Sequence, residues 1–240
     1  MKKSIVLATA VAAVLTSGVA TAEFSGNAAL TSNYIWRGVT QTTDQAAGQG
    51  GIDWGNDSGI YVGTWVSNVN FDNSDDGYEM DVYAGFAGEA GSLGYDVGVI
   101  SYQYPVSPQF NFTELYLSGT MSIVTIGVSY TVDAASGNDA EKDPNASGQY
   151  EEGDVYVNGS LDFSAGKSDV SLYAGSYMFD QDGKDNSATG GAVIGEVDYN
   201  HFGASIGKDG FTFAVDKNDI KGGSADNVRF TVSYAVDFEL

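Results

Sequence analysis

The chain has no cysteine, a single histidine and only three prolines among its 240 residues. Without cysteine there are no disulfides, even in a compartment that allows them. The only histidine is His201, so a Ser-His-Asp triad has one candidate base, and the segment Tyr199–Phe202 around it carries no nucleophile motif. We interpret His201 as a surface or strand-end residue and expect neither an enzyme nor a cofactor.

Basic residues are also scarce. Ten lysines and arginines face 32 aspartates and glutamates, which gives a net charge of −22. A protein this acidic does not bind nucleic acid by neutralising phosphates. Two acidic segments, 72–77 and 180–186, resemble the start of a calcium loop. The first has Tyr83 at the twelfth position and the second has Lys184 at a ligand position, so we predict no metal site.

The first 22 residues have the pattern of a cleaved secretory signal peptide. Lys2 and Lys3 precede the apolar run 5–15, and the small residues 20–22 form a cleavage site. No run of 18 apolar residues follows, so no membrane-spanning helix is expected. We predict that residues 23–240 form a single domain.

Glycine and tyrosine are abundant instead, with 32 and 15 residues, and both argue against helices. A two-residue periodicity runs through most of the chain. In the segment 229–240 every even-numbered residue is apolar, which puts one face of a strand in an apolar medium. We predict twelve strands: 25–39, 44–55, 58–69, 78–89, 93–104, 110–121, 123–133, 150–163, 168–180, 189–206, 210–219 and 226–240.

The connections between these strands alternate between tight turns and longer polar loops. An even number of antiparallel strands with this alternation is typical of an outer-membrane β-barrel. Trp36, Trp54 and Trp65 lie near strand ends, where an aromatic girdle would meet the membrane interface. The alternative is a soluble periplasmic barrel or sandwich, which would also show alternating strands.

The last strand ends at the chain terminus with Phe238 and Leu240 on its apolar face. Such a strand suits recognition by the barrel-insertion machinery. The other expected partners are outer-membrane lipid, lipopolysaccharide and small solutes.

Several blocks are specific when taken together: YIWRGVTQ from Tyr34, GIYVGTWVSN from Gly59, and LYLSG from Leu115. On these blocks the chain resembles the Gcw-type proteobacterial family, whose members are catalogued as outer-membrane porins of the TorF type. The resemblance covers essentially the whole mature chain. It implies an exported barrel and transport, without naming a solute.

Arg37 and Arg229 are the only two arginines. If Tyr34 and Trp36 face lipid on the first strand, Arg37 points into the lumen. An arginine on the lipid face would cost up to about 2–4 kcal/mol. Because the first and last strands of a closed barrel pair, we expect Arg37 and Arg229 to lie together near the outer mouth. The candidate pore-lining residues are Arg37, Arg229, Asp53, Glu79, Asp81 and Glu114.

Two interpretations of these charges stay open. The arginines could hold anionic groups opposite the lumen acids and so set selectivity. They could instead be locked in bidentate pairs with lumen acids and only close the wall. A twelve-stranded barrel is between the filled eight-stranded and the open 16-stranded sizes, so any channel is narrow. Inward glycines such as Gly85, Gly98 and Gly175 leave room in it, and inward tyrosines take part of that room back: Tyr83, Tyr116, Tyr156 and Tyr173.

The sequence therefore predicts an outer-membrane porin-like protein, a narrow passive channel for small cationic or polar solutes. The alternatives are a non-conducting structural or surface-interaction barrel, and an outer-membrane hydrolase, which a loss of activity in His201→Ala would support. The solute, the oligomeric state and the role of the loop 134–149 are left open.

Overall fold

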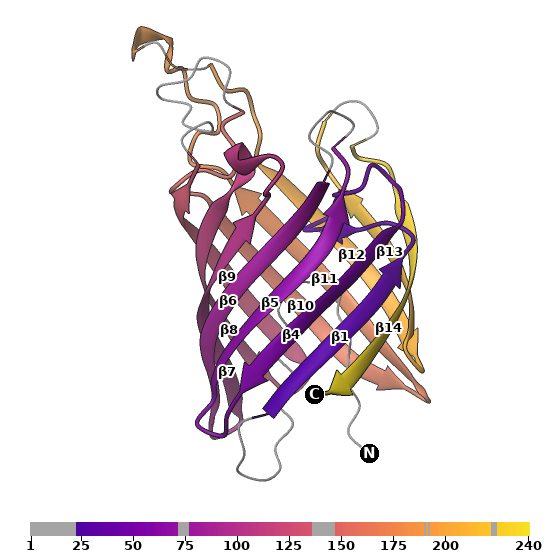
Figure 1. The fold of residues 1–240 in the computed structure, drawn as a ribbon. Helices are drawn as coiled ribbons and strands as arrows, with labels where there is room; N and C mark the ends of the chain where they lie inside the picture. Colours follow the sequence, from indigo (N-terminus) through magenta and orange to yellow (C-terminus); the bar gives the residue numbers. More distant parts are fainter. Residues whose placement is uncertain (1–22, 72–76, 136–146, 190, 192, 222–224) are drawn as a thin grey trace.

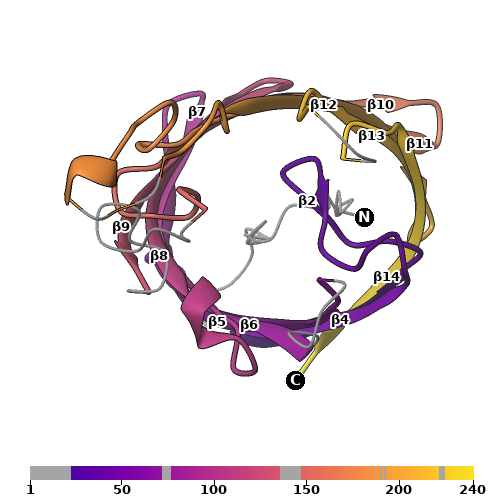
Figure 2. The same ribbon diagram turned by 90° about the horizontal axis from the view of Figure 1, so that it is seen from above.

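The computed structural model describes residues 23–71, 77–135, 147–189, 191, 193–221 and 225–240. The expected signal segment 1–22 lies outside these residues, as do residues 72–76 of the first acidic segment and residues 136–146 of the loop 134–149. Twelve antiparallel strands form a closed barrel (Figures 1 and 2). Its strands are β1 (Glu23–Thr31), β4 (Ala47–Gly55), β5 (Ile60–Val69), β6 (Gly77–Ala90), β7 (Leu93–Gln103), β8 (Phe112–Met121), β9 (Val124–Ala134), β10 (Val155–Ala165), β11 (Ser168–Met178), β12 (Tyr199–Lys208), β13 (Phe211–Asn218) and β14 (Arg229–Glu239).

The prediction of an all-β barrel with twelve strands is confirmed, and three strand boundaries are wrong. The first strand ends at Thr31 rather than at residue 39, the eighth begins at Val155 rather than at residue 150, and the tenth begins at Tyr199 rather than at residue 189. The residues that follow β1 form a separate short hairpin, β2 (Ile35–Trp36) with β3 (Val39–Thr40). The residues before β12 include a 3₁₀ turn, Ser187–Thr189, and an isolated bridge between Asp185 and Val193.

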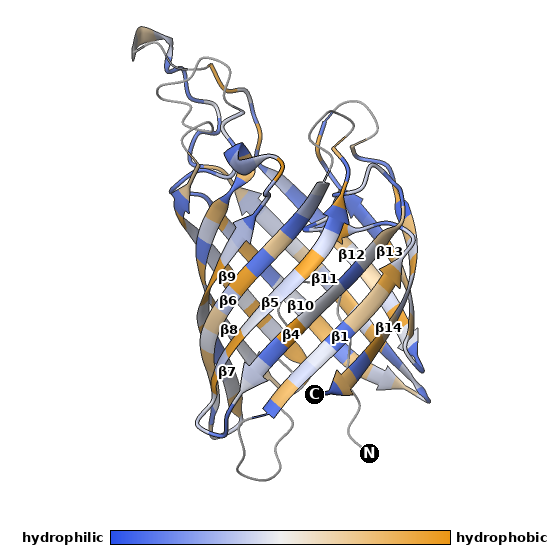
Figure 3. Ribbon diagram, in the orientation of Figure 1, coloured by the Kyte–Doolittle hydropathy of each residue, from blue (hydrophilic) through white to orange (hydrophobic). Residues whose placement is uncertain are grey.

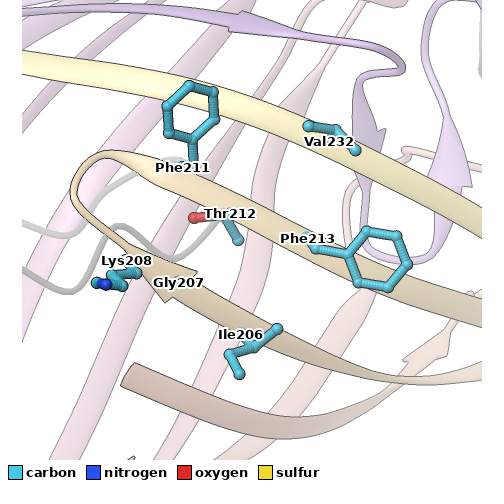
Figure 4. A pocket seen from close by; sticks show the side chains of 7 residues that line it. All are labelled: Ile206, Gly207, Lys208, Phe211, Thr212, Phe213 and Val232. Atoms are coloured by element: carbon cyan, nitrogen blue, oxygen red, sulfur yellow. The ribbon is translucent and has the colours of Figure 1, made fainter. Parts of the chain in front are cut away.

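The outer surface of the barrel is apolar, as Figure 3 shows by the alternation of colours along each strand. Leu30, Ile126 and Phe230 are each more than 60% exposed, and comparable side chains project from every other position of the neighbouring strands. A shallow groove lined by Ile206, Phe211, Phe213 and Val232 opens on this surface near the β12–β13 turn (Figure 4). So much exposed apolar area is stable only against the hydrocarbon of a membrane.

The two ends of the barrel differ. Short turns join the strands at the end where the chain's C-terminus lies, and long loops rise from the opposite end (Figure 1). Short turns on the periplasmic side, long loops outside and an apolar outer band together define an outer-membrane barrel. The protein is therefore located in the outer membrane. No helix in the described part of the chain is long and apolar enough to span a membrane.

Residues 32–46, between β1 and β4, do not extend outward. This segment, here called the inward loop, bends into the barrel, and its β2 strand lies inside the ring of wall strands in Figure 2. Arg37, Thr43 and Asp44 in this loop have positive φ angles of 47°, 49° and 58°. Side chains other than glycine adopt this conformation only when surrounding contacts hold it. The inward loop is therefore fixed by what it touches.

Inside the barrel, tyrosine rings lie against glycines of the adjacent strand. In the register, Tyr61 is opposite Gly85, Tyr116 opposite Gly98, and Tyr173 opposite Gly203. A Cβ placed on any of these glycines would overlap the facing tyrosine side chain. The expectation that inward glycines leave open space is wrong for Gly85, Gly98 and Gly175, because tyrosine side chains, and at Gly175 also His201, occupy it. The glycines let the rings lie along the wall.

Candidate functional site: the plugged lumen

Arg37 lies at the tip of the inward loop, between β2 and β3, and binds Glu114 on β8. Its Nη1 and Nη2 donate to the two carboxylate oxygens of Glu114 at 2.8 and 2.6 Å. The two side chains are 7% and 1% exposed. A bidentate pair of this kind fixes both position and orientation. A register shift in the β8–β9 ladder occurs between Thr113 and Glu114. Such bulges re-aim nearby side chains.

Aromatic rings surround the guanidinium of Arg37. Its Cζ lies 4.3 Å from the ring centre of Trp36, 4.1 Å from that of Tyr156 and 5.0 Å from that of Tyr177. Rings at these distances stabilise a cation through their π faces, more strongly where water is excluded. Because Glu114 and three aromatic rings contact its guanidinium, Arg37 joins the inward loop to the barrel wall.

The rest of the inward loop packs into an aromatic cluster at the extracellular half of the lumen. Trp36 contacts the rings of Tyr102, Phe112, Tyr150 and Tyr177 at centroid distances of 5.6–6.2 Å. The expectation that Tyr34 and Trp36 face lipid is wrong, as they are 7% and 8% exposed inside the barrel. Trp65 also packs inside, against Tyr34 at 5.4 Å, so neither Trp36 nor Trp65 belongs to a girdle.

Arg229, the first residue of β14, also binds the inward loop. Its Nε donates to Oδ1 of Asp44 in the inward loop at 2.7 Å, and its Nη1 donates to the carbonyl of Ala225 at 2.8 Å. The expected pairing of Arg37 with Arg229 on adjacent strands is wrong, because Arg37 is not on β1. Instead, one arginine reaches from the loop to the wall, and the other from the wall to the loop.

The predicted lumen carboxylates all point inward, at two levels. Glu79, Asp81 and Glu114 lie at the extracellular level and are at most 1% exposed. Asp53, at the periplasmic end of β4, is half-buried and accepts a hydrogen bond from the hydroxyl of Tyr83. The structure thus brings Glu79, Asp81, Glu114 and Arg37 into the region of the inward loop, and leaves Asp53 below it.

The periplasmic half of the lumen is lined by acids. On β4 and β7, Asp53 and Asp96 face inward and bond tyrosine hydroxyls, that of Tyr61 donating to Asp96 at 2.6 Å. Strand alternation places further carboxylates on this face near the periplasmic rim: Glu89, Asp162, Asp169, Asp237 and Glu239. Among the described strand residues, Lys208 and Lys217 alternate to the outer face and Arg229 lies at the extracellular end. The field in this half therefore attracts cations.

His201 is at the beginning of β12 as expected, but it is not a surface residue. It is 5% exposed, and its Nε2 lies 2.7 Å from the hydroxyl of Tyr156. Gly38 of the inward loop packs against it so closely that a Cβ on that glycine would overlap the His201 side chain. The amide of Asn218 also donates to the carbonyl of Gly38 at 2.7 Å. His201 thus forms part of the surface that receives the loop.

Sequence reasoning missed Tyr150, Tyr177 and Asp154, and it identified Tyr156 only as an inward side chain and not as a contact of Arg37. Asp154 lies just before β10, and its two carboxylate oxygens accept backbone N–H groups of Glu151 at 2.9 Å and Asp180 at 2.8 Å. Burial raises the pKa of Asp154 to about 6, and these N–H donors oppose the rise only in part. The sequence did hold a signal for the tyrosines, because aromatic residues stand next to polar loops: Tyr150 after the loop 134–149, and Tyr177 before the loop that leads to β12.

The chain belongs to the family described as bacterial protein of unknown function (Gcw_chp), which matches residues 16–238. The resemblance drawn from the sequence blocks is thereby confirmed. No curated protein matches the chain.

Many solved structures match the fold, among them the following two. One is named "KdgM porin", with a TM-score of 0.54 and 8% identity, over 90% of this chain and 99% of that one. The other is described as "Unveiling the Mechanism Behind the in-meso Crystallization of Membrane Proteins", with a TM-score of 0.54 and 10% identity, over 90% of this chain and 83% of that one. At these identities the likeness is one of fold.

Proposed function

We propose that this member of the Gcw_chp family is a narrow passive channel for small cationic or polar solutes. A closed barrel with a polar interior and an apolar exterior is the architecture of a porin. The similar fold of the KdgM porin supports the same function. The signal-like residues 1–22 support export before insertion. The exposed Phe238 and Leu240, at the end of β14, support recognition by the barrel-insertion machinery.

The observation that carries the solute class is the acidic periplasmic half of the lumen. Asp53 and Asp96 are only partly buried, and the other inward acids of that half stand near the rim. Arg37 does not offset them, because Glu114 already neutralises its charge. Rings of carboxylates favour cations over anions. The proposed pore-lining residues are therefore Asp53 and Asp96, whereas Arg37, Arg229, Glu79 and Glu114 hold the inward loop, and Asp81 lies beside Glu79.

Single-channel recording of the refolded mature protein in a planar bilayer with a salt gradient tests this function. We expect discrete openings and a reversal potential of the sign that indicates cation preference. Asp53→Asn combined with Asp96→Asn reduces that potential toward zero. Glu196→Gln, on an exposed extracellular loop, is the control and leaves it unchanged.

A second candidate is a non-conducting structural or surface-interaction barrel. It is favoured by the packing of Trp36 and its aromatic neighbours across the extracellular half. A correctly refolded barrel without openings under any condition would support this candidate and contradict the channel.

A further inference from the structure

Glu79 and Asp81 form a buried acidic pair on β6. They are two residues apart, so both point inward, and they are 1% and 0% exposed. Glu79 is well supplied with donors, since the hydroxyls of Tyr34 and Tyr104 donate to its two oxygens at 3.1 and 3.0 Å. In the described residues, neither carboxylate oxygen of Asp81 has a donor from any other group.

The charges around this pair do not neutralise it. The groups that interact with it electrostatically are Tyr34 from the inward loop, Tyr83 on β6, Tyr102 on β7, Tyr104 after β7, Glu114 on β8 and Tyr150 before β10. The nearby cation, Arg37, is engaged by Glu114. Two ionised carboxylates side by side without water or a counter-charge are strongly unfavourable.

One proton resolves the conflict. If Asp81 is a neutral acid, its O–H donates to Glu79, and Glu79 remains the single anion with three donors. Carboxylates that share a site hold one proton between them for this reason. A metal ion fits the site less well, because no group of three or more Asp, Glu, His or Cys side chains suited to a metal occurs among the described residues.

The pair is joined directly to the inward loop. The Tyr34 hydroxyl that donates to Glu79 belongs to that loop, and the Tyr34 ring packs on Trp65 of β5. The two anchors of the loop that carry a positive charge, Arg37 and Arg229, have guanidinium groups that stay charged at all physiological pH values. Glu79 is therefore the anchor with a neighbour, Asp81, that can gain or lose a proton.

We propose that Glu79 and Asp81 bind one proton between them, and that this proton holds the inward loop in the lumen. When the proton leaves to solvent, Asp81 becomes a second buried anion beside Glu79. Water must then enter to solvate it, and the Tyr34 contact that closes the site gives way. The inference rests on the proposed channel, in which release of the loop widens the extracellular half of the lumen.

Two readouts on one protein test the switch. In a Trp54→Phe background the remaining tryptophans, Trp36 and Trp65, both lie at the inward loop. We expect acrylamide quenching of their fluorescence, and the fraction of time the channel is open, each to rise several-fold as the pH is raised and the shared proton leaves. Asp81→Asn keeps an N–H donor toward Glu79 and cannot ionise, so both readouts stay low throughout.

Glu79→Gln serves as a second variant if Asp81→Asn fails to fold, since its amide can donate to an ionised Asp81 and keep the loop in place. Glu196→Gln, on an exposed extracellular loop away from both the pair and the pore-lining acids, is the control and retains the pH response. A flat wild-type response, or an equal response in wild type and Asp81→Asn, overturns the switch. So does quenching that follows added calcium or a chelator at fixed pH. If acrylamide quenching rises with pH but no channel openings occur, the switch is supported and the proposed channel is contradicted.

Discussion

Arg37 and Glu114 are 77 residues apart in the sequence, and two parallel hydrogen bonds of 2.8 and 2.6 Å join them across the barrel interior. The bonds link the tip of the inward loop to β8. Of the two interpretations that the sequence left open for Arg37, this geometry favours the locked pair. Selectivity is then assigned to the acids below the loop.

Removing one partner of this pair leaves the other charged and buried. We expect Arg37→Met to lower the free energy of unfolding by about 3–5 kcal/mol, because Glu114 loses its counter-charge. Urea unfolding in detergent micelles, followed by the loss of heat-modifiable migration, measures the change. The double variant Arg37→Met with Glu114→Leu recovers much of the loss. Full wild-type stability in the single variant, with altered ion selectivity, would show that Arg37 acts on solutes.

The tyrosine–glycine contacts give a second prediction. A Cβ on Gly98 would overlap the hydroxyl of Tyr116 and lie 2.6 Å from the carbonyl oxygen of Ala84. We expect Gly98→Ala to destabilise the barrel by about 1–3 kcal/mol through overpacking. Gly94 is on the same strand and the same inward face, and its added Cβ would find its nearest neighbour at 3.7 Å. Gly94→Ala is therefore the matched control in the same unfolding assay, and equal effects of the two changes would contradict the packing.

Gly38 tests how the inward loop is seated. Its φ is +79°, and an added Cβ would collide with His201. We expect Gly38→Ala to displace the loop, so that Trp36 becomes accessible to acrylamide and the conductance rises. Gly166 has a φ of +67° and open space around it, so Gly166→Ala carries the backbone strain without the collision. If acrylamide quenches tryptophan fluorescence equally in both variants, the contact with His201 does not hold the loop.

Asp154 gives a pH dependence. Its pKa is about 6 in the folded protein against the ordinary 3.8, so the folded protein holds a proton over the interval between them. The stability that this proton contributes is complete below 3.8 and is lost as the pH rises through about 6. We expect unfolding free energies measured from pH 4 to 7 to decline less steeply in Asp154→Asn than in wild type. Asn also loses one acceptor for the N–H groups of Glu151 and Asp180, so this variant is weaker at every pH. Parallel pH curves would contradict the assignment.

The sequence predicts the wall of this barrel well because lipid and lumen impose opposite chemistry on successive residues. The strand 229–239 is the clearest case. The position of the inward loop could not be predicted from this alternation. Tyr34, Trp36 and Arg37 alternate like strand residues, and an aromatic residue in a membrane barrel suits lipid as well as a packed interior. Only the folded chain shows that Gly38 reverses direction and that Tyr150, Tyr156 and Tyr177 gather around Arg37. Those partners are more than 100 residues away, beyond any local pattern.

The pairing of β1 with β14, which matches Ser25 to Glu239 and Thr31 to Ser233, has a consequence for how the molecule assembles. The seam of the barrel joins the two ends of the chain, so the wall closes only after the last strand is present. The inward loop leaves β1 early in the sequence, yet its anchors come from β6, β8, β12, β13 and β14. Contacts of such long sequence separation form slowly. The loop is therefore expected to seat last, after an interval in which the newly closed barrel has an open lumen.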